Sequence, residues 1–98
     1  MITEIKDDNL IKSNDFCFMD FYADWCGPCQ MLSPIIDQLS EEVDTVDFYK
    51  LNADDSEEVM SEYGIMSIPT LLIFEDKQLK AKLVGFKTKE ELLKAIND

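Results

Sequence analysis

The sequence has 98 residues, of which 46% are hydrophobic, and 21 acidic residues outnumber nine lysines to give a formal net charge of -12. This composition predicts one domain over residues 1–98 with one hydrophobic core, and a surface that repels nucleic acid and anionic membranes. The absence of histidine removes the commonest general base and the commonest zinc ligand. No apolar run reaches the roughly 18 residues of a membrane span, and the acidic N-terminus lacks an apolar signal segment, so we expect a cytoplasmic protein.

The spacing of apolar residues in the first half of the chain predicts strands alternating with helices. We expect a short strand over 2–5, about a turn of helix over 8–12, and a strand over 16–22 that is buried on both faces. From Cys26 the apolar spacing changes to 3.6 residues, which predicts a long amphipathic helix with Pro34 inside it.

The middle of the chain continues this alternation. A strand is expected over 46–51, followed by a short helix through Tyr63. Asp55 and Glu58 have the spacing of a capping box at the start of that helix, and Gly64 can end it in the left-handed conformation.

The last third predicts a strand over 70–74, a tight turn at 76–77 and a second strand over 78–84. Thr88 and Glu91 form another predicted capping box, at the start of a final helix. The whole order indicates an α/β protein, with a mixed sheet of about five strands flanked by helices on both faces.

Two cysteines follow the second strand, at the sheet edge where α/β proteins place functional groups. The spacing puts Cys26 at the start of a helix, where free N–H groups and the helix dipole favour a thiolate, and Cys29 one turn deeper and less accessible. Thiol–disulfide exchange requires such a pair. A zinc site needs four ligands, and Cys17 is the one other cysteine, so the pair predicts redox chemistry. On its buried strand, Cys17 is expected to act as a small hydrophobe.

The segment DFYADWCGPC at 20–29 resembles the active-site stretch of the thioredoxin family. Similarity extends along nearly the whole chain, through Pro34 and through KLNADD at 50–55, YGIMSIPTLLIF at 63–74 and VGF at 84–86. The resemblance implies a thioredoxin fold and dithiol–disulfide oxidoreductase activity. Cys26 would be the nucleophile and Cys29 the resolving thiol, and Gly27–Pro28 adds no cation between them, which favours a reductant.

The resemblance also gives a role to Asp20, the one carboxylate within the apolar strand. It implies that Asp20 handles the proton of Cys29 and that Lys50 is its buried ion-pair partner. Burial beside Phe18 and Phe21 should raise the pKa of Asp20 into the range of a base that works near neutral pH. The alternatives are that Asp20 is a solvated carboxylate at the end of the strand and that Lys50 is an ordinary surface lysine.

A substrate chain is expected to dock on an apolar surface beside the cysteines. The resemblance assigns this surface to Trp25, Gly27, Pro28, Ile68, Pro69, Gly85 and Phe86, with a cis Ile68–Pro69 bond. It implies disulfide-containing protein substrates, no bound cofactor or metal, a monomer, and electrons supplied by a thioredoxin reductase.

Three positions depart from the family pattern. Tyr22 stands where many thioredoxins have tryptophan, Gln30 replaces the usual basic residue after the motif, and Lys77 replaces a hairpin glycine. These changes leave the choice of partners open.

Two other functions are also considered: an interaction or scaffold subunit with incidental cysteines, and an electron donor dedicated to one partner enzyme.

Overall fold

The computed structural model describes residues 2–9 and 16–98, so most of the helical turn predicted over 8–12 lies outside the described residues. The elements in chain order are β1 (Ile2–Glu4), β2 (Phe16–Tyr22), α1 (Gly27–Glu42), β3 (Asp47–Asn52), the 3-10 turn η2 (Ala53–Asp55), α2 (Glu57–Glu62), β4 (Thr70–Glu75), β5 (Gln78–Val84) and α3 (Lys89–Asn97).

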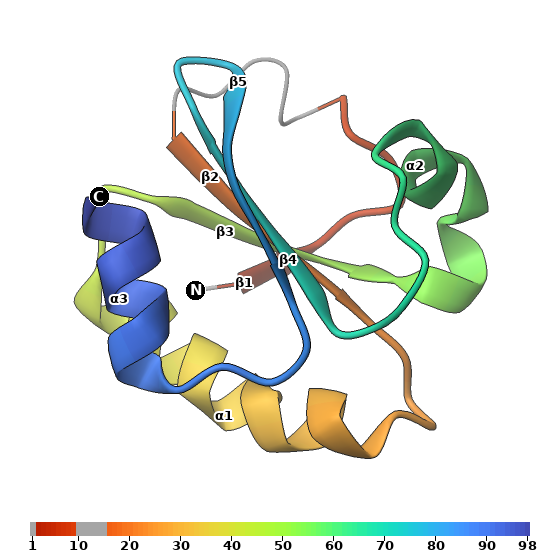
Figure 1. Ribbon diagram of the computed structural model, residues 1–98, viewed down its shortest axis with the longest axis horizontal. Coiled ribbons are helices and arrows are strands. Elements are labelled where there is room, and N and C mark those ends of the chain that lie inside the picture. The colour runs from red at the N-terminus through yellow and green to blue at the C-terminus, as the bar shows by residue number, and fades with distance from the viewer. Residues whose placement is uncertain (1, 10–15) are drawn as a thin grey trace.

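The strands form one five-stranded sheet in the order β1-β3-β2-β4-β5. β1, β3 and β2 run parallel, whereas β4 is antiparallel to both of its neighbours, β2 and β5. Helices α1 and α3 lie on one face of the sheet and α2 lies on the other (Figure 1). The predicted mixed sheet with helices on both faces is confirmed.

Side chains of β2 alternate between the two faces because successive residues of a strand point in opposite directions. Phe18 packs in the cluster that contains Leu32 of α1 and Leu92 of α3. Met19 packs in the opposite cluster with Val59 of α2. Asp20, two residues after Phe18, therefore belongs to the face that α1 covers, close to where that helix begins.

The predicted turns have the expected backbone geometry. Asp76 and Lys77 adopt φ angles of 55° and 66°, as a two-residue hairpin turn of type I′ requires, and Gly64 has a φ of 64° after α2. The capping box before α3 is present: the Glu91 N–H donates to Thr88 Oγ1 at 3.2 Å, and the Thr88 N–H donates to Glu91 Oε1 at 3.1 Å.

The predicted capping box at Asp55 and Glu58 is wrong. Helix α2 begins at Glu57, its N-cap is Ser56, and the Ser56 side chain makes no capping hydrogen bond. The cause lies in the residues just before α2. Asn52 Oδ1 accepts the N–H of Asp54 at 2.9 Å and starts the 3-10 turn η2, so Asp55 belongs to that turn and does not cap α2.

Over residues 2–9 and 16–98, no helix has both the length and the apolar character needed to cross a bilayer.

Candidate active site

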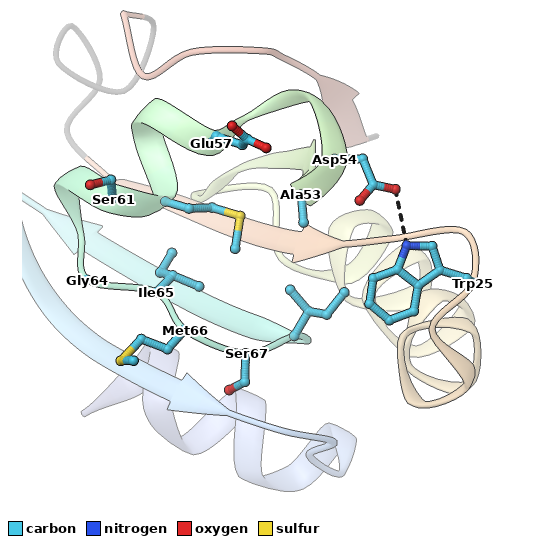
Figure 2. Close-up of a pocket in the computed structure, with 11 residues that line it drawn as sticks. Trp25, Ala53, Asp54, Glu57, Ser61, Gly64, Ile65, Met66 and Ser67 are labelled. Atoms are coloured by element: carbon cyan, nitrogen blue, oxygen red, sulfur yellow. Dashed lines mark hydrogen bonds between the residues drawn. The ribbon is translucent and has the colours of Figure 1, made fainter.

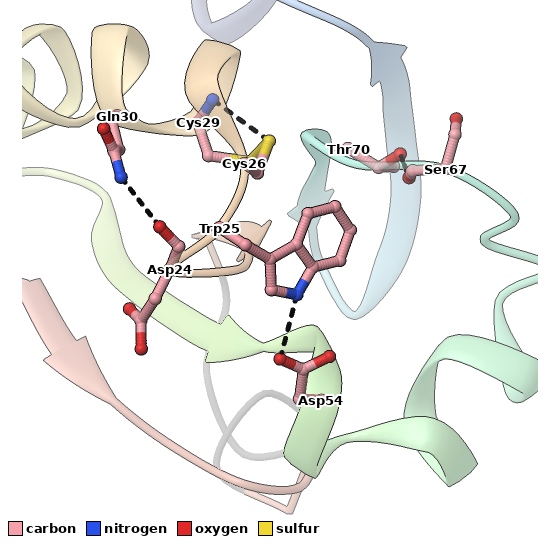
Figure 3. The surroundings of a disulfide bond; sticks show 8 residues. All are labelled: Asp24, Trp25, Cys26, Cys29, Gln30, Asp54, Ser67 and Thr70. Atoms are coloured by element: carbon pink, nitrogen blue, oxygen red, sulfur yellow. Dashed lines mark hydrogen bonds between the residues drawn. A yellow bond between two sulfur atoms is a disulfide. The ribbon is translucent and has the colours of Figure 1, made fainter.

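The two cysteines lie where β2 gives way to α1. The Cys26 N–H donates to the Ala23 carbonyl at 3.2 Å, which closes a turn between the two elements. Cys26 then occupies the N-cap of α1, where its Sγ accepts the Cys29 N–H at 3.2 Å (Figure 3). Pro28 falls in the first helical turn, where a missing N–H leaves no hydrogen bond broken. The sulfur of Cys26 thus stands at the positive end of the helix dipole.

Cys26 and Cys29 form a disulfide, with 5.2 Å between their Cα atoms. This separation is ordinary for a disulfide, and the i, i+3 spacing brings the two side chains together at the helix start. In the described part of the chain, no group of three cysteine or carboxylate side chains is arranged to hold a metal ion. Cys17 is fully buried in β2, in agreement with its predicted role in packing.

The expected difference in exposure between the two cysteines is absent from this oxidised form, in which each is 5% exposed. Ala23 packs with the pair, and the side chains of Tyr22 and Ile68 contact that cluster. Both sulfurs therefore lie under apolar cover in the disulfide form. What does differ is their polar surroundings, since Cys29 and not Cys26 lines the cavity that holds Asp20.

Asp20 is buried, with 7% of its surface exposed, and no donor in the described chain reaches its Oδ1 atom. Burial raises the pKa of Asp20 to about 7; nearby Lys50 acts to lower the pKa, and Asp37 acts to raise it. The carboxyl group lines a cavity of about 330 Å³ together with Cys29, Ser33 and Lys50. A solvated carboxylate at a strand end is therefore excluded, and Asp20 shares its cavity with the second cysteine.

Lys50 lies beside Asp20 but departs from the expected buried ion pair. The two residues are register partners on β3 and β2, yet Lys50 is half-buried and makes no direct ion pair with Asp20. Its Nζ lies 5.6 Å from the centroid of the Tyr22 ring, a cation–π distance, and the Tyr22 hydroxyl donates to Glu4 Oε2 at 2.8 Å. The ring in the place of the family's tryptophan thus offers the ammonium group an alternative partner.

The Ile68–Pro69 peptide bond is cis, as the resemblance implied. Ile68 packs against the cysteine cluster, and the Gly85 N–H donates to the Pro69 carbonyl at 2.8 Å. Gly85 has a φ of 89°, a conformation that favours glycine. The structure therefore brings the loop before β4 and the end of β5 together beside the disulfide.

A groove of about 800 Å³ adjoins the cysteines (Figure 2). Trp25, which is 71% exposed, stands at one end and donates from its Nε1 to Asp54 Oδ2 at 3.1 Å. Asp54, Glu57 and Met66 also line this groove and were not predicted from the sequence. A signal for Asp54 was present, because it follows the carboxyl end of β3, next to the strand that leads to the cysteines.

Gln30, the replacement for the usual basic residue, turns away from the sulfurs. Its Nε2 donates to the Asp24 carbonyl at 2.7 Å, which ties the first turn of α1 to the loop before it (Figure 3). Because its amide is neutral, Gln30 supplies structural support to this loop and no charge to the thiols.

The cysteine pair closes into a disulfide at the start of a helix, Cys29 shares a cavity with a buried carboxyl group, and Ile68, which precedes a cis-proline, packs against the pair. These are the features of the redox centre of a thiol–disulfide oxidoreductase. Comparisons with known proteins agree. The thioredoxin family model matches residues 3–98. Thioredoxin from Rickettsia typhi is 42% identical over 98 residues, which cover 98% of this chain and 93% of that protein.

Solved structures give the same result. A single-site mutant of thioredoxin from Halobacterium salinarum NRC-1 superimposes with a TM-score of 0.90 at 34% identity, covering 98% of this chain and 88% of the other. Oxidised mitochondrial thioredoxin 3 from Saccharomyces cerevisiae superimposes with a TM-score of 0.91 at 37% identity, and the match covers 99% of this chain and 94% of the other. The chain belongs to the thioredoxin family, which confirms the expected fold and its dithiol–disulfide chemistry.

Proposed function

We propose that this protein reduces disulfide bonds of other proteins, with Cys26 as the nucleophile and Cys29 as the resolving thiol. The observation that carries the assignment is the asymmetry of the two sulfurs. Cys26 Sγ caps α1 and accepts a backbone N–H, whereas Cys29 lines the cavity of Asp20. The first arrangement stabilises a thiolate before substrate arrives, and the second supplies a base to a thiol that must ionise later.

In the first step the Cys26 thiolate attacks one sulfur of the substrate disulfide. A bond forms between Cys26 and that sulfur, the substrate's S–S bond breaks, and the other substrate sulfur leaves as a thiolate. The partial positive charge at the start of α1 favours the attacking thiolate, and the first turn of this helix carries no acidic side chain to oppose it.

In the second step Asp20 accepts the proton of Cys29, and the new thiolate attacks Cys26. The Cys26–Cys29 bond forms, the mixed disulfide breaks, and the second substrate sulfur leaves as a thiolate. Because two electrons have passed to the substrate, the protein ends the reaction in its disulfide form. A pKa of about 7 lets Asp20 hold and release a proton near neutral pH, and the charge of nearby Lys50 favours the carboxylate that begins this step.

The substrate chain docks on the surface around the disulfide. Ile68 and Trp25 provide apolar contact, and the backbone beside Pro69 offers hydrogen-bonding groups to an extended segment. A Cβ built on Gly27 meets no atom within 4 Å, so the motif itself is open to a second chain. The surface comprises Trp25, Gly27, Pro28, Ile68, Pro69, Gly85 and Phe86.

Recycling requires an external reductant because each turnover leaves a disulfide behind. We assign this role to a thioredoxin reductase, with no cofactor bound to the chain itself, and we place the protein in the cytoplasm as a monomer. The redox chemistry of the pair supports the reductase and a reducing compartment. The net charge of -12 disfavours nucleic acid and anionic membranes as partners.

Reduction of insulin by dithiothreitol tests the proposal. The protein at micromolar concentration should accelerate the reaction, and Cys17→Ser should accelerate it equally because the buried Cys17 takes no part. An absence of acceleration would instead favour a scaffold with incidental cysteines. Slow reduction of insulin together with fast exchange with a single enzyme would identify a dedicated electron donor.

A further inference from the structure

The groove beside the cysteines joins exposed apolar side chains to the redox centre. Met66 is 95% exposed and Trp25 is 71% exposed, and both line it. Ile68 lines the same groove and also packs against the cysteine cluster, so the groove is continuous with the disulfide. A substrate segment that presents its disulfide to Cys26 therefore places neighbouring residues in this groove.

The charged side chains that line the groove are all acidic. They are Asp54, which bonds the indole of Trp25, and Glu57, at the start of α2 (Figure 2). Asp55 and Glu58 follow them around the same end of the helix and line the adjoining hollow. The negative charge is thus concentrated on one segment, 54–58, at the side of the groove away from β5.

Lys6 lines the adjoining hollow beside these carboxylates, but no lysine of the described residues forms an ion pair with them. The ion pairs among the described residues are Lys80–Glu75 and Lys89–Glu42, both remote from the groove. Lys82 approaches the opposite end, where its Nζ donates to the Gly64 carbonyl at 3.0 Å. The groove therefore offers apolar contact with Trp25 and Met66 and a row of carboxylates along one side.

We infer that this groove selects disulfides in protein segments that carry lysine or arginine next to an apolar residue. The inference rests on the proposed reductase function and specifies its substrates. An approaching cation is attracted by the carboxylates of 54–58, which raises the association rate, whereas an acidic segment is repelled. The apolar residue of the segment is covered by Trp25 and Met66.

The test compares three synthetic peptide disulfides that share one apolar residue and differ in the flanking side chain: lysine, glutamine or glutamate. The rate constant for oxidation of the reduced protein by each peptide is measured at low and at high ionic strength. At low salt the lysine peptide should react at least ~10-fold faster than the glutamate peptide, and ~0.5 M salt should shrink this ratio because it screens exposed charges.

Two variants locate the source of the selectivity. Glu57→Lys should cut the lysine-to-glutamate ratio several-fold, and Glu57→Gln should give an intermediate ratio without placing a cation at the start of α2. Glu41→Lys is the matched control, since it makes the same change in net charge at an exposed position on α1, across the sheet from α2. It should leave the ratio within about twofold of the original protein.

Each outcome decides a separate question. Equal rates with the three peptides would overturn the inference while leaving the reductase function in place. An equal loss of selectivity in Glu41→Lys and Glu57→Lys would overturn it as well, because net charge rather than the groove would then be responsible. Failure to reduce any of the peptides would overturn the proposed function and the inference together.

Discussion

Cys26→Ser should lose disulfide reduction by a factor on the order of 10³ or more, because a serine hydroxyl is not ionised near neutral pH and cannot form the mixed disulfide. The variant should still fold, since the side chain at the N-cap of α1 keeps an oxygen that accepts the Cys29 N–H. The rate of insulin reduction with dithiothreitol measures the loss.

Cys29→Ser is the matched control, because it keeps the nucleophile and removes the resolving thiol. It should accumulate a covalent adduct with substrate, which mass spectrometry detects as a species whose mass is the sum of the masses of the variant and the substrate. An adduct in Cys26→Ser and none in Cys29→Ser would reverse the roles assigned to the two sulfurs.

Asp20→Asn should slow the second step of the reaction. The amide that replaces the carboxylate cannot accept a proton, so ionisation of Cys29 would depend on solvent, and general-base assistance of this kind contributes about 10²-fold or more. Single-turnover kinetics near pH 7 should show normal formation of the mixed disulfide and slow release of the substrate. Unchanged release at this pH would remove Asp20 from the mechanism.

The same substitution should stabilise the protein at alkaline pH. Asp20 has a pKa of about 7 in the folded chain against an ordinary value of 3.8, so the folded state binds its proton more tightly than the unfolded state. Stability is therefore lost as the pH rises from 3.8 through 7. At 1.36 kcal/mol per pH unit, ionisation of Asp20 lowers the free energy of unfolding by about 4 kcal/mol above roughly pH 8. Asp20→Asn carries no charge at this position and does not lose that stability.

Urea unfolding at about pH 4 and about pH 8 measures this effect. The gain in the free energy of unfolding should be large at the higher pH and nearly absent at the lower. Asp37→Asn is a useful control, since Asp37 is exposed and acts on Asp20 through charge alone. An equal gain at both pH values would show that Asp20 is not held protonated by burial.

The positions of the cysteine pair and of the nearby carboxylate were predictable because their signals are local, whereas the proton-transfer role of Asp20 came from the family resemblance. A carboxylate inside the apolar run 16–22 and two cysteines at i, i+3 after it are visible without any long-range contact. Strand alternation alone then places Asp20 on the same face as Phe18, under α1. The cis bond before Pro69 came from the family resemblance and not from the residues themselves.

The features that were missed depend on where distant segments meet. Trp25 and Asp54 are 29 positions apart and come together only when β2 and β3 pair. Lys50 was assigned to Asp20 by resemblance, yet the ring of Tyr22, fixed by Glu4 from β1, changes its surroundings. Such contacts follow from tertiary packing, which neither periodicity nor motif spacing specifies.

Selective alkylation of the reduced protein tests most directly whether Cys26 is the nucleophile. A brief exposure to iodoacetamide near pH 7, followed by peptide mapping, should find Cys26 modified at least ~10-fold faster than Cys29, because the start of α1 favours the thiolate of the first cysteine. Equal labelling of the two, or a Cys26 that does not react at this pH, would contradict the mechanism.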